Sequence, residues 1–213
     1  SSQFEQTNNS ITAAVTSSKE YTDSAVSGIQ IGGRNLFRNT KYGGDWYANN
    51  WGTGKYSVSK EQVSENVGGI PLDEVTVFLK TQAGTGDIKM ASTSYSNIPY
   101  AELENKNVTI SFYAKCQENI KTSVSILIQN KYNGIISSKT WRISELSDNW
   151  VKYQYTFPID KTTNKEGIVV FFTLSDSFLI KKIYFCLLKG EIGNKATDWS
   201  PAPEDAENAL TEY

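Results

Sequence analysis

The stretch Val108-Thr109-Ile110-Ser111-Phe112-Tyr113-Ala114-Lys115-Cys116 alternates apolar and polar side chains. Successive side chains of a β-strand point to opposite faces, so this alternation predicts a strand with one buried face. The face toward the core is expected to carry Val108, Ile110, Phe112, Ala114 and Cys116. The face away from it is expected to carry Thr109, Ser111, Tyr113 and Lys115.

Similar short segments lie on both sides of this strand. Alternating or apolar runs are found at residues 56–59, 74–80, 122–129, 150–157, 167–174 and 182–188, and residues 35–37 are predicted to form the first strand. A hairpin signal, Lys131-Tyr132-Asn133-Gly134, separates two of them. Roughly nine or ten short strands without helical patterns between them predict an all-β fold, an antiparallel β-sandwich of the jelly-roll kind.

The N-terminal residues 1–30 follow a helical spacing with a narrow apolar seam. The seam runs through Phe4, Asn8, Ile11, Val15, Ser18, Thr22, Ala25 and Ile29. A narrow seam favours a coiled-coil stalk, which implies a homo-oligomer formed through this helix. Because Ser, Thr and Asn are weak helix formers, an unstructured linker is the alternative.

Two boundaries divide the chain into three parts. Gly32 and Gly33 end the predicted stalk, and Pro201 and Pro203 end the predicted sheets. The β-sandwich is therefore expected to span residues 31–203, and residues 204–213, which begin Glu-Asp, are expected to start an exit helix. A β-domain with a helix before it and a helix after it is the arrangement expected of a module inserted into a fibrous protein.

Composition excludes several classes of function. A net charge of −2 gives no basic field for nucleic acid, and no apolar run approaches the roughly 20 residues of a membrane span. The absence of histidine removes the commonest general base and the commonest metal ligand. No catalytic residues, cofactor or metal are predicted, and no Asp-rich loop supports a structural calcium. Cys116 and Cys186 are predicted to be buried thiols rather than a disulfide.

The richest candidate binding stretch is the Gly/Asn-rich segment 42–56. Saccharide recognition needs flat aromatic faces for the C–H face of a sugar ring, together with polar groups for its hydroxyls. The predicted ligand-binding residues here are Trp46, Tyr47, Asn49, Trp51 and Tyr56. The alternative is that one of the two tryptophans closes the end of the sandwich.

Three further candidates lie on predicted strands. Trp141 follows the hairpin signal, and Tyr113 and Gln129 are placed to line a groove on a sheet face. Trp150 and Trp199 are instead interpreted as framework residues.

Four stretches carry a resemblance to a known group of proteins: residues 32–36 (Gly-Gly-Arg-Asn-Leu), 108–115, 149–157 and 188–205. Together they resemble the carbohydrate-binding modules in tail and baseplate proteins of phages that infect Gram-positive bacteria. These modules are jelly rolls similar to carbohydrate-binding families 4 and 9. The first stretch resembles their entry motif and the last their exit motif.

The resemblance implies a non-enzymatic virion component, assembled in the bacterial cytoplasm, that aids host adhesion. Its expected partners are a host cell-wall or surface saccharide and other tail or baseplate proteins. A structural spacer without a saccharide ligand is the main alternative. A glycan-degrading enzyme fragment is the other, although no Asp or Glu lies in a recognisable catalytic context.

Overall fold

The computed structural model describes residues 2–27, 32–43, 56–82, 86–92, 102–117, 120–130, 135–159, 165–174 and 181–205. The labelled elements among these residues are one long helix, α1 (Ser2–Ser27), and the nine strands that follow it. The strands are β1 (Tyr56–Val67), β2 (Ile70–Lys80), β3 (Gly86–Ser92), β4 (Asn107–Cys116), β5 (Ile120–Asn130), β6 (Ile135–Leu146), β7 (Val151–Pro158), β8 (Lys165–Leu174) and β9 (Lys182–Ile192).

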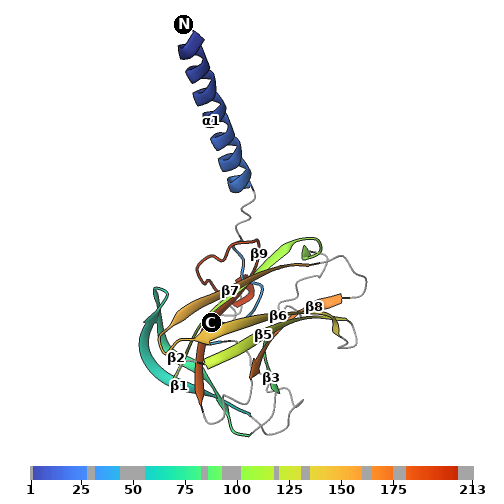
Figure 1. Ribbon diagram of the computed structural model, residues 1–213. Helices are drawn as coiled ribbons and strands as arrows, with labels where there is room; N and C mark the ends of the chain where they lie inside the picture. The colour runs from blue at the N-terminus through green and yellow to red at the C-terminus, as the bar shows by residue number, and fades with distance from the viewer. Residues whose placement is uncertain are drawn as a thin grey trace.

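The strands form two antiparallel sheets (Figure 1). The five-stranded sheet has the order β1-β2-β9-β4-β7, and the four-stranded sheet has the order β3-β8-β5-β6. The alternating stretch of the sequence is β4, which pairs with β7 on one side and β9 on the other. The predicted antiparallel β-sandwich is therefore confirmed, as is the helix that precedes it.

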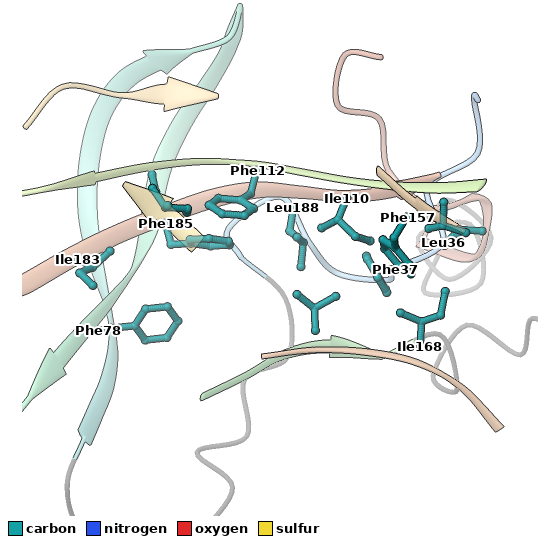
Figure 2. Close-up of a cluster of buried hydrophobic side chains, with 14 of the residues drawn as sticks. Leu36, Phe37, Phe78, Ile110, Phe112, Phe157, Ile168, Ile183, Phe185 and Leu188 are labelled. Carbon is teal, nitrogen blue, oxygen red and sulfur yellow. The ribbon is translucent and has the colours of Figure 1, made fainter. Parts of the chain in front are cut away.

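The main core lies between the two sheets. Phe112, Phe185 and Phe78 come from the five-stranded sheet, while Ile168 and Val170 come from the four-stranded sheet. Figure 2 shows the phenylalanine rings gathered between the strands, with Phe112 and Phe185 at 4.7 Å between ring centroids. All five residues of β4 that were predicted to face the core are buried in this cluster.

The opposite face of the five-stranded sheet is also covered. Val77, Cys186 and Tyr113 directly adjoin the core phenylalanines in sequence, so they point the other way and belong to a second cluster. The turn of the β1–β2 hairpin lies on Tyr113, because a Cβ on Gly68 would come within 2.5 Å of the tyrosine Oη. Thr109 and Ser111, predicted to face outward, do lie on this face but are only 1% and 2% exposed.

Residues 32–43, here called the entry segment, contain no strand, so the strand predicted at residues 35–37 was wrong. The physical reason is the Asn35 side chain. Its Oδ1 accepts a hydrogen bond from Phe37 N at 3.1 Å, which bends the chain where a strand would continue straight. The segment nevertheless lies along β9, because Leu36 N donates to Gly190 O at 2.7 Å.

Residues 193–205, here called the exit segment, return to the entry segment. Ser200 Oγ donates to Gly33 O at 3.4 Å, and Arg34 forms an ion pair with Glu204. Residues 203–205 are helical, and the rest of the predicted exit helix lies outside the described residues. The points where the chain enters and leaves the sandwich are therefore held together.

Figure 1 shows α1 as a rod outside the sheets, and its apolar side chains Phe4, Ile11 and Val15 are exposed. No helix among the described residues is both long and apolar enough to span a membrane. Cys116 and Cys186 are buried free thiols, as predicted.

Candidate functional site

Four of the five residues predicted to bind ligand in segment 42–56 are not among the described residues. Trp46, Tyr47, Asn49 and Trp51 lie outside the described residues. Tyr56 opens β1 and Gln129 lies near the end of β5, but only their backbones are described. Their roles in ligand binding therefore stay predictions.

Trp141 lies in β6 and points between the two sheets. Its ring is stacked on Tyr155 of β7, with centroids 5.7 Å apart and planes 11° apart. It also contacts Phe112 at 5.8 Å and packs, half-buried, against the main core. Trp141 thus closes the side of the sandwich between β6 and β7, and its ring supports the fold whatever else it contacts.

Tyr113 lies on the other face of the five-stranded sheet, under the β1–β2 turn. Burial raises the pKa of its hydroxyl, and the nearby Asp198 and Cys186 add to the increase. Because Tyr113 follows Phe112 directly, it points away from the side that Trp141 occupies. The structure therefore does not bring these two predicted site residues together.

A pocket of about 870 Å³ opens where the entry segment, β1 and the exit segment meet. It is lined by residues 39–42, by residues 58–60 of β1, and by Trp199, Pro201 and Asp205. The pocket therefore joins two parts of the chain that the sequence places near opposite ends of the β-domain.

Two lysine ammonium groups lie near the ring of Tyr42, and all three residues line this pocket. Lys41 Nζ lies 4.9 Å and Lys60 Nζ 5.6 Å from the centroid of its ring, within the range of cation–π attraction. Two hydrogen bonds to β2 hold Tyr42 in place. Its hydroxyl donates to Asp73, and the Thr76 hydroxyl donates to its backbone carbonyl. The hydrogen bond from Tyr42 also lowers the pKa of the Asp73 carboxyl.

Trp199 supplies an aromatic surface at the pocket wall. Its indole Nε1 donates to Thr40 Oγ1 at 3.2 Å, and the half-buried ring packs against the second cluster. The hydrogen bond fixes the orientation of the indole. A planar apolar face held in this way is suited to stacking against a sugar ring.

The Asp205 carboxylate stabilises the junction of the entry and exit segments. It accepts hydrogen bonds from Asn39 N at 3.0 Å and from Ala202 N at 3.3 Å, and Arg38 Nε lies 3.8 Å away. Asp205 is the only acid among the described lining residues, so they offer no facing pair of carboxyl groups. The described residues also contain no cluster of three or more His, Cys, Asp or Glu side chains placed to hold a metal ion.

Sequence reasoning missed this pocket as a site. Trp199 was interpreted as framework, and its bond to Thr40 is consistent with that, but it also faces the pocket. Tyr42 and Lys41 were passed over in favour of the aromatics that follow them. Two signals in the sequence could have pointed to it. Lys41 and Tyr42 begin a Gly/Asn-rich stretch, and the exit motif at the other end of the β-domain contains Trp199.

No family model and no curated protein sequence matches this chain. Among solved structures, the tandem family 22 carbohydrate-binding modules of Paenibacillus barcinonensis Xyn10C match 79% of this chain at 12% identity and a TM-score of 0.52. A proposed sugar-binding protein from Bacteroides thetaiotaomicron matches 75% of the chain at 14% identity and a TM-score of 0.50.

The α-L-arabinofuranosidase MgGH51 matches 78% of the chain at 11% identity and a TM-score of 0.50. The matched region covers 100% of the Bacteroides protein, 48% of the tandem modules and 26% of the arabinofuranosidase. At these identities the likeness concerns the fold, which is the sandwich found in carbohydrate-binding modules.

Proposed function

We propose that this chain is a non-catalytic carbohydrate-binding module. The observation that carries the proposal is the pocket in which Trp199, Tyr42 and two lysines meet between the entry and exit segments. A sugar ring stacked on the Trp199 indole would place its hydroxyl groups near the polar side chains of Asn39 and Ser59. The sandwich fold, shared with carbohydrate-binding modules, supports this reading without identifying a ligand.

The saccharide we propose is a cell-wall or surface polysaccharide of a bacterial host. The module would belong to the tail or baseplate of a phage of Gram-positive bacteria, would be assembled in the host cytoplasm, and would contact other tail proteins. This context rests on the resemblance of the entry and exit motifs. The pairing of Arg34 with Glu204 supports it, because a domain whose ends meet is easily inserted into a longer fibrous chain.

Adhesion by such a module would depend on several copies acting together. One stacked sugar with a few hydrogen bonds gives weak binding, and linked copies raise the overall affinity strongly. The exposed seam residues Phe4, Ile11 and Val15 of α1 support self-association through this helix.

A structural spacer is the second candidate. The contacts between the entry and exit segments favour it, since they would hold a domain in a fibre whether or not it binds sugar. The glycan-degrading alternative is less favoured, because the acid in the pocket, Asp205, receives backbone N–H groups of the fold.

The test is binding of the fluorescently labelled chain to intact cells of a panel of Gram-positive strains and to their purified polysaccharides. Trp199→Leu removes the stacking surface, and Trp150→Leu is its matched control. Both tryptophans are half-buried against the second cluster, but only Trp199 is among the described lining residues. Ser59→Gln fills pocket space, and Ser57→Gln, also exposed on β1, is its control.

We expect strain-selective binding that falls at least about tenfold in Trp199→Leu and Ser59→Gln, and stays near wild type in the two controls. Circular dichroism and thermal unfolding verify that each variant is folded. Binding lost equally in variants and controls would contradict the pocket as the site. Failure to bind any strain, even as a multimer, would contradict saccharide binding and leave the spacer.

A further inference from the structure

We infer that the ligand of this pocket is an anionic saccharide, in which a carboxylate or phosphate lies beside the sugar ring and binds Lys41 and Lys60. This inference rests on the proposed saccharide binding and adds the chemical class of the ligand. It comes from the arrangement of charge around Tyr42.

The ammonium groups of two lysines lie near the same aromatic ring. Lys41 Nζ and Lys60 Nζ lie 4.9 and 5.6 Å from the same Tyr42 centroid. Like charges repel, so bringing two of them to one ring opposes folding unless something offsets the repulsion. The ring offsets part of it by cation–π attraction, and an anion bound between the lysines would offset more.

The acids near the pocket leave this positive charge only partly neutralised. Lys60 pairs with Glu74 at 2.7 Å. Asp73 lies close enough to Lys41 for the charge of the lysine to help lower the pKa of this carboxyl, although no ion pair within the described part of the chain joins the two. Asp205 faces the pocket, yet its oxygens accept the backbone N–H groups of Asn39 and Ala202. Among the described lining residues, two lysines therefore stand against one acid, on a chain whose net charge is −2.

The same geometry argues against a neutral sugar held by two aromatic rings. Tyr42 presents its ring to the lysines, which leaves the Trp199 indole as the stacking surface that the described lining residues offer. One stacked ring together with a pair of ammonium groups matches a sugar unit that carries an anion. Lysine binds both carboxylates and phosphates as a compact point charge.

The test compares chemically matched forms of one polysaccharide, purified from a strain that the chain labels. One portion is dephosphorylated with hydrofluoric acid, another is carboxyl-reduced after carbodiimide activation, and a third is left untreated. We expect binding to fall at least about tenfold for one treated form and to stay unchanged for the other, which identifies the anion. Equal binding to all three forms would overturn the inference while leaving saccharide binding intact.

Variants of Lys41 test the same inference from the protein side. Lys41→Gln is expected to weaken binding to the untreated polysaccharide about tenfold and to leave binding to the sensitive treated form unchanged. Lys41→Arg keeps the charge and should retain most of the affinity. Lys106→Gln, an exposed lysine that is not among the described lining residues, is the control.

Two outcomes separate failure of the inference from failure of the proposed function. Loss of binding in Trp199→Leu together with wild-type binding in Lys41→Gln would overturn the anionic ligand and keep a neutral saccharide. Absence of binding to every polysaccharide tested would overturn both.

Discussion

The side-chain amide of Asn35 donates a hydrogen bond to the carbonyl oxygen of Ser200 at 3.1 Å, across 165 positions of sequence. The same nitrogen lies 2.9 Å from Thr40 Oγ1 and 3.2 Å from Leu188 O, and Oδ1 accepts a hydrogen bond from Gly190 N at 3.2 Å. Asn35 is fully buried. One side chain therefore joins the entry segment, β9 and the exit segment.

Replacing Asn35 with alanine is expected to lower the free energy of unfolding by about 2–4 kcal/mol. The substitution leaves the buried Gly190 N–H and Leu188 carbonyl without this partner, and each unsatisfied buried group costs about 1–3 kcal/mol. Urea unfolding followed by circular dichroism measures the change. Asn66→Ala, at an exposed position of β1, is the control and should shift stability by less than about 0.5 kcal/mol. Equal effects of the two substitutions would contradict the role given to Asn35.

Gly190 lies against Phe37, and we expect Gly190→Ala to destabilise the fold by about 1–3 kcal/mol. A Cβ at residue 190 would meet Phe37 Cε2 at 2.4 Å, so the packed ring or the strand must shift. Gly33→Ala is the matched control, because a Cβ there meets nothing within 4 Å. Thermal unfolding of the two variants decides the point, and a Gly190→Ala protein as stable as Gly33→Ala would show that the close contact is absent.

These residues show which parts of the fold can be predicted from sequence. The alternation in β4 predicted its buried side chains correctly, because a period of two directly reflects strand geometry. The covering of Tyr113 on its other face by the β1–β2 turn could not be predicted, since a turn carries no periodic signal. The strand expected at residues 35–37 failed because a local side-chain hydrogen bond competes with strand pairing.

The candidate site was harder to predict than the fold. Tyr42 and Trp199 meet at one pocket because contacts such as those of Asn35 and Thr40 hold the entry and exit segments together. Such long-range hydrogen bonds leave no pattern in a single sequence. The candidates in segment 42–56 were predicted because aromatic residues in a Gly/Asn-rich stretch are hard to bury. That argument does not indicate which residues from other parts of the chain lie beside them.

The stacked pair Trp141 and Tyr155 is expected to show a coupling energy of about 0.5–1.5 kcal/mol in a double-mutant cycle. The pair connects β6 of one sheet with β7 of the other, so its loss should loosen this side of the sandwich. The variants are Trp141→Leu, Tyr155→Leu and the double variant, compared by urea unfolding. Combining Trp141→Leu with Trp150→Leu, whose ring belongs to the second cluster, should give additive effects. Additivity in the Trp141–Tyr155 cycle as well would show that the stack contributes nothing beyond burial.

Cys186 should make the fold less stable at alkaline pH. Cys186 lies in β9, and its thiol is buried in the second cluster on the outer face of the five-stranded sheet. This burial, together with the nearby Glu65 carboxylate, raises its pKa far above the usual range. In the unfolded chain the thiol ionises near pH 8.5, whereas in the folded chain it keeps its proton. Above that pH the unfolded state therefore binds fewer protons than the folded state, and the free energy of unfolding falls as pH rises.

We expect wild type to lose about 1 kcal/mol more stability than Cys186→Ala between about pH 7.5 and about pH 9.5, whatever the absolute stability of the variant. Urea unfolding at several pH values gives the two slopes, and the difference between them isolates this thiol from other groups that titrate in the range. The same burial should keep Cys186 unreactive toward a thiol reagent until the chain unfolds. Parallel slopes, or rapid labelling of Cys186 in the folded chain, would mean that the second cluster does not exclude water from this position.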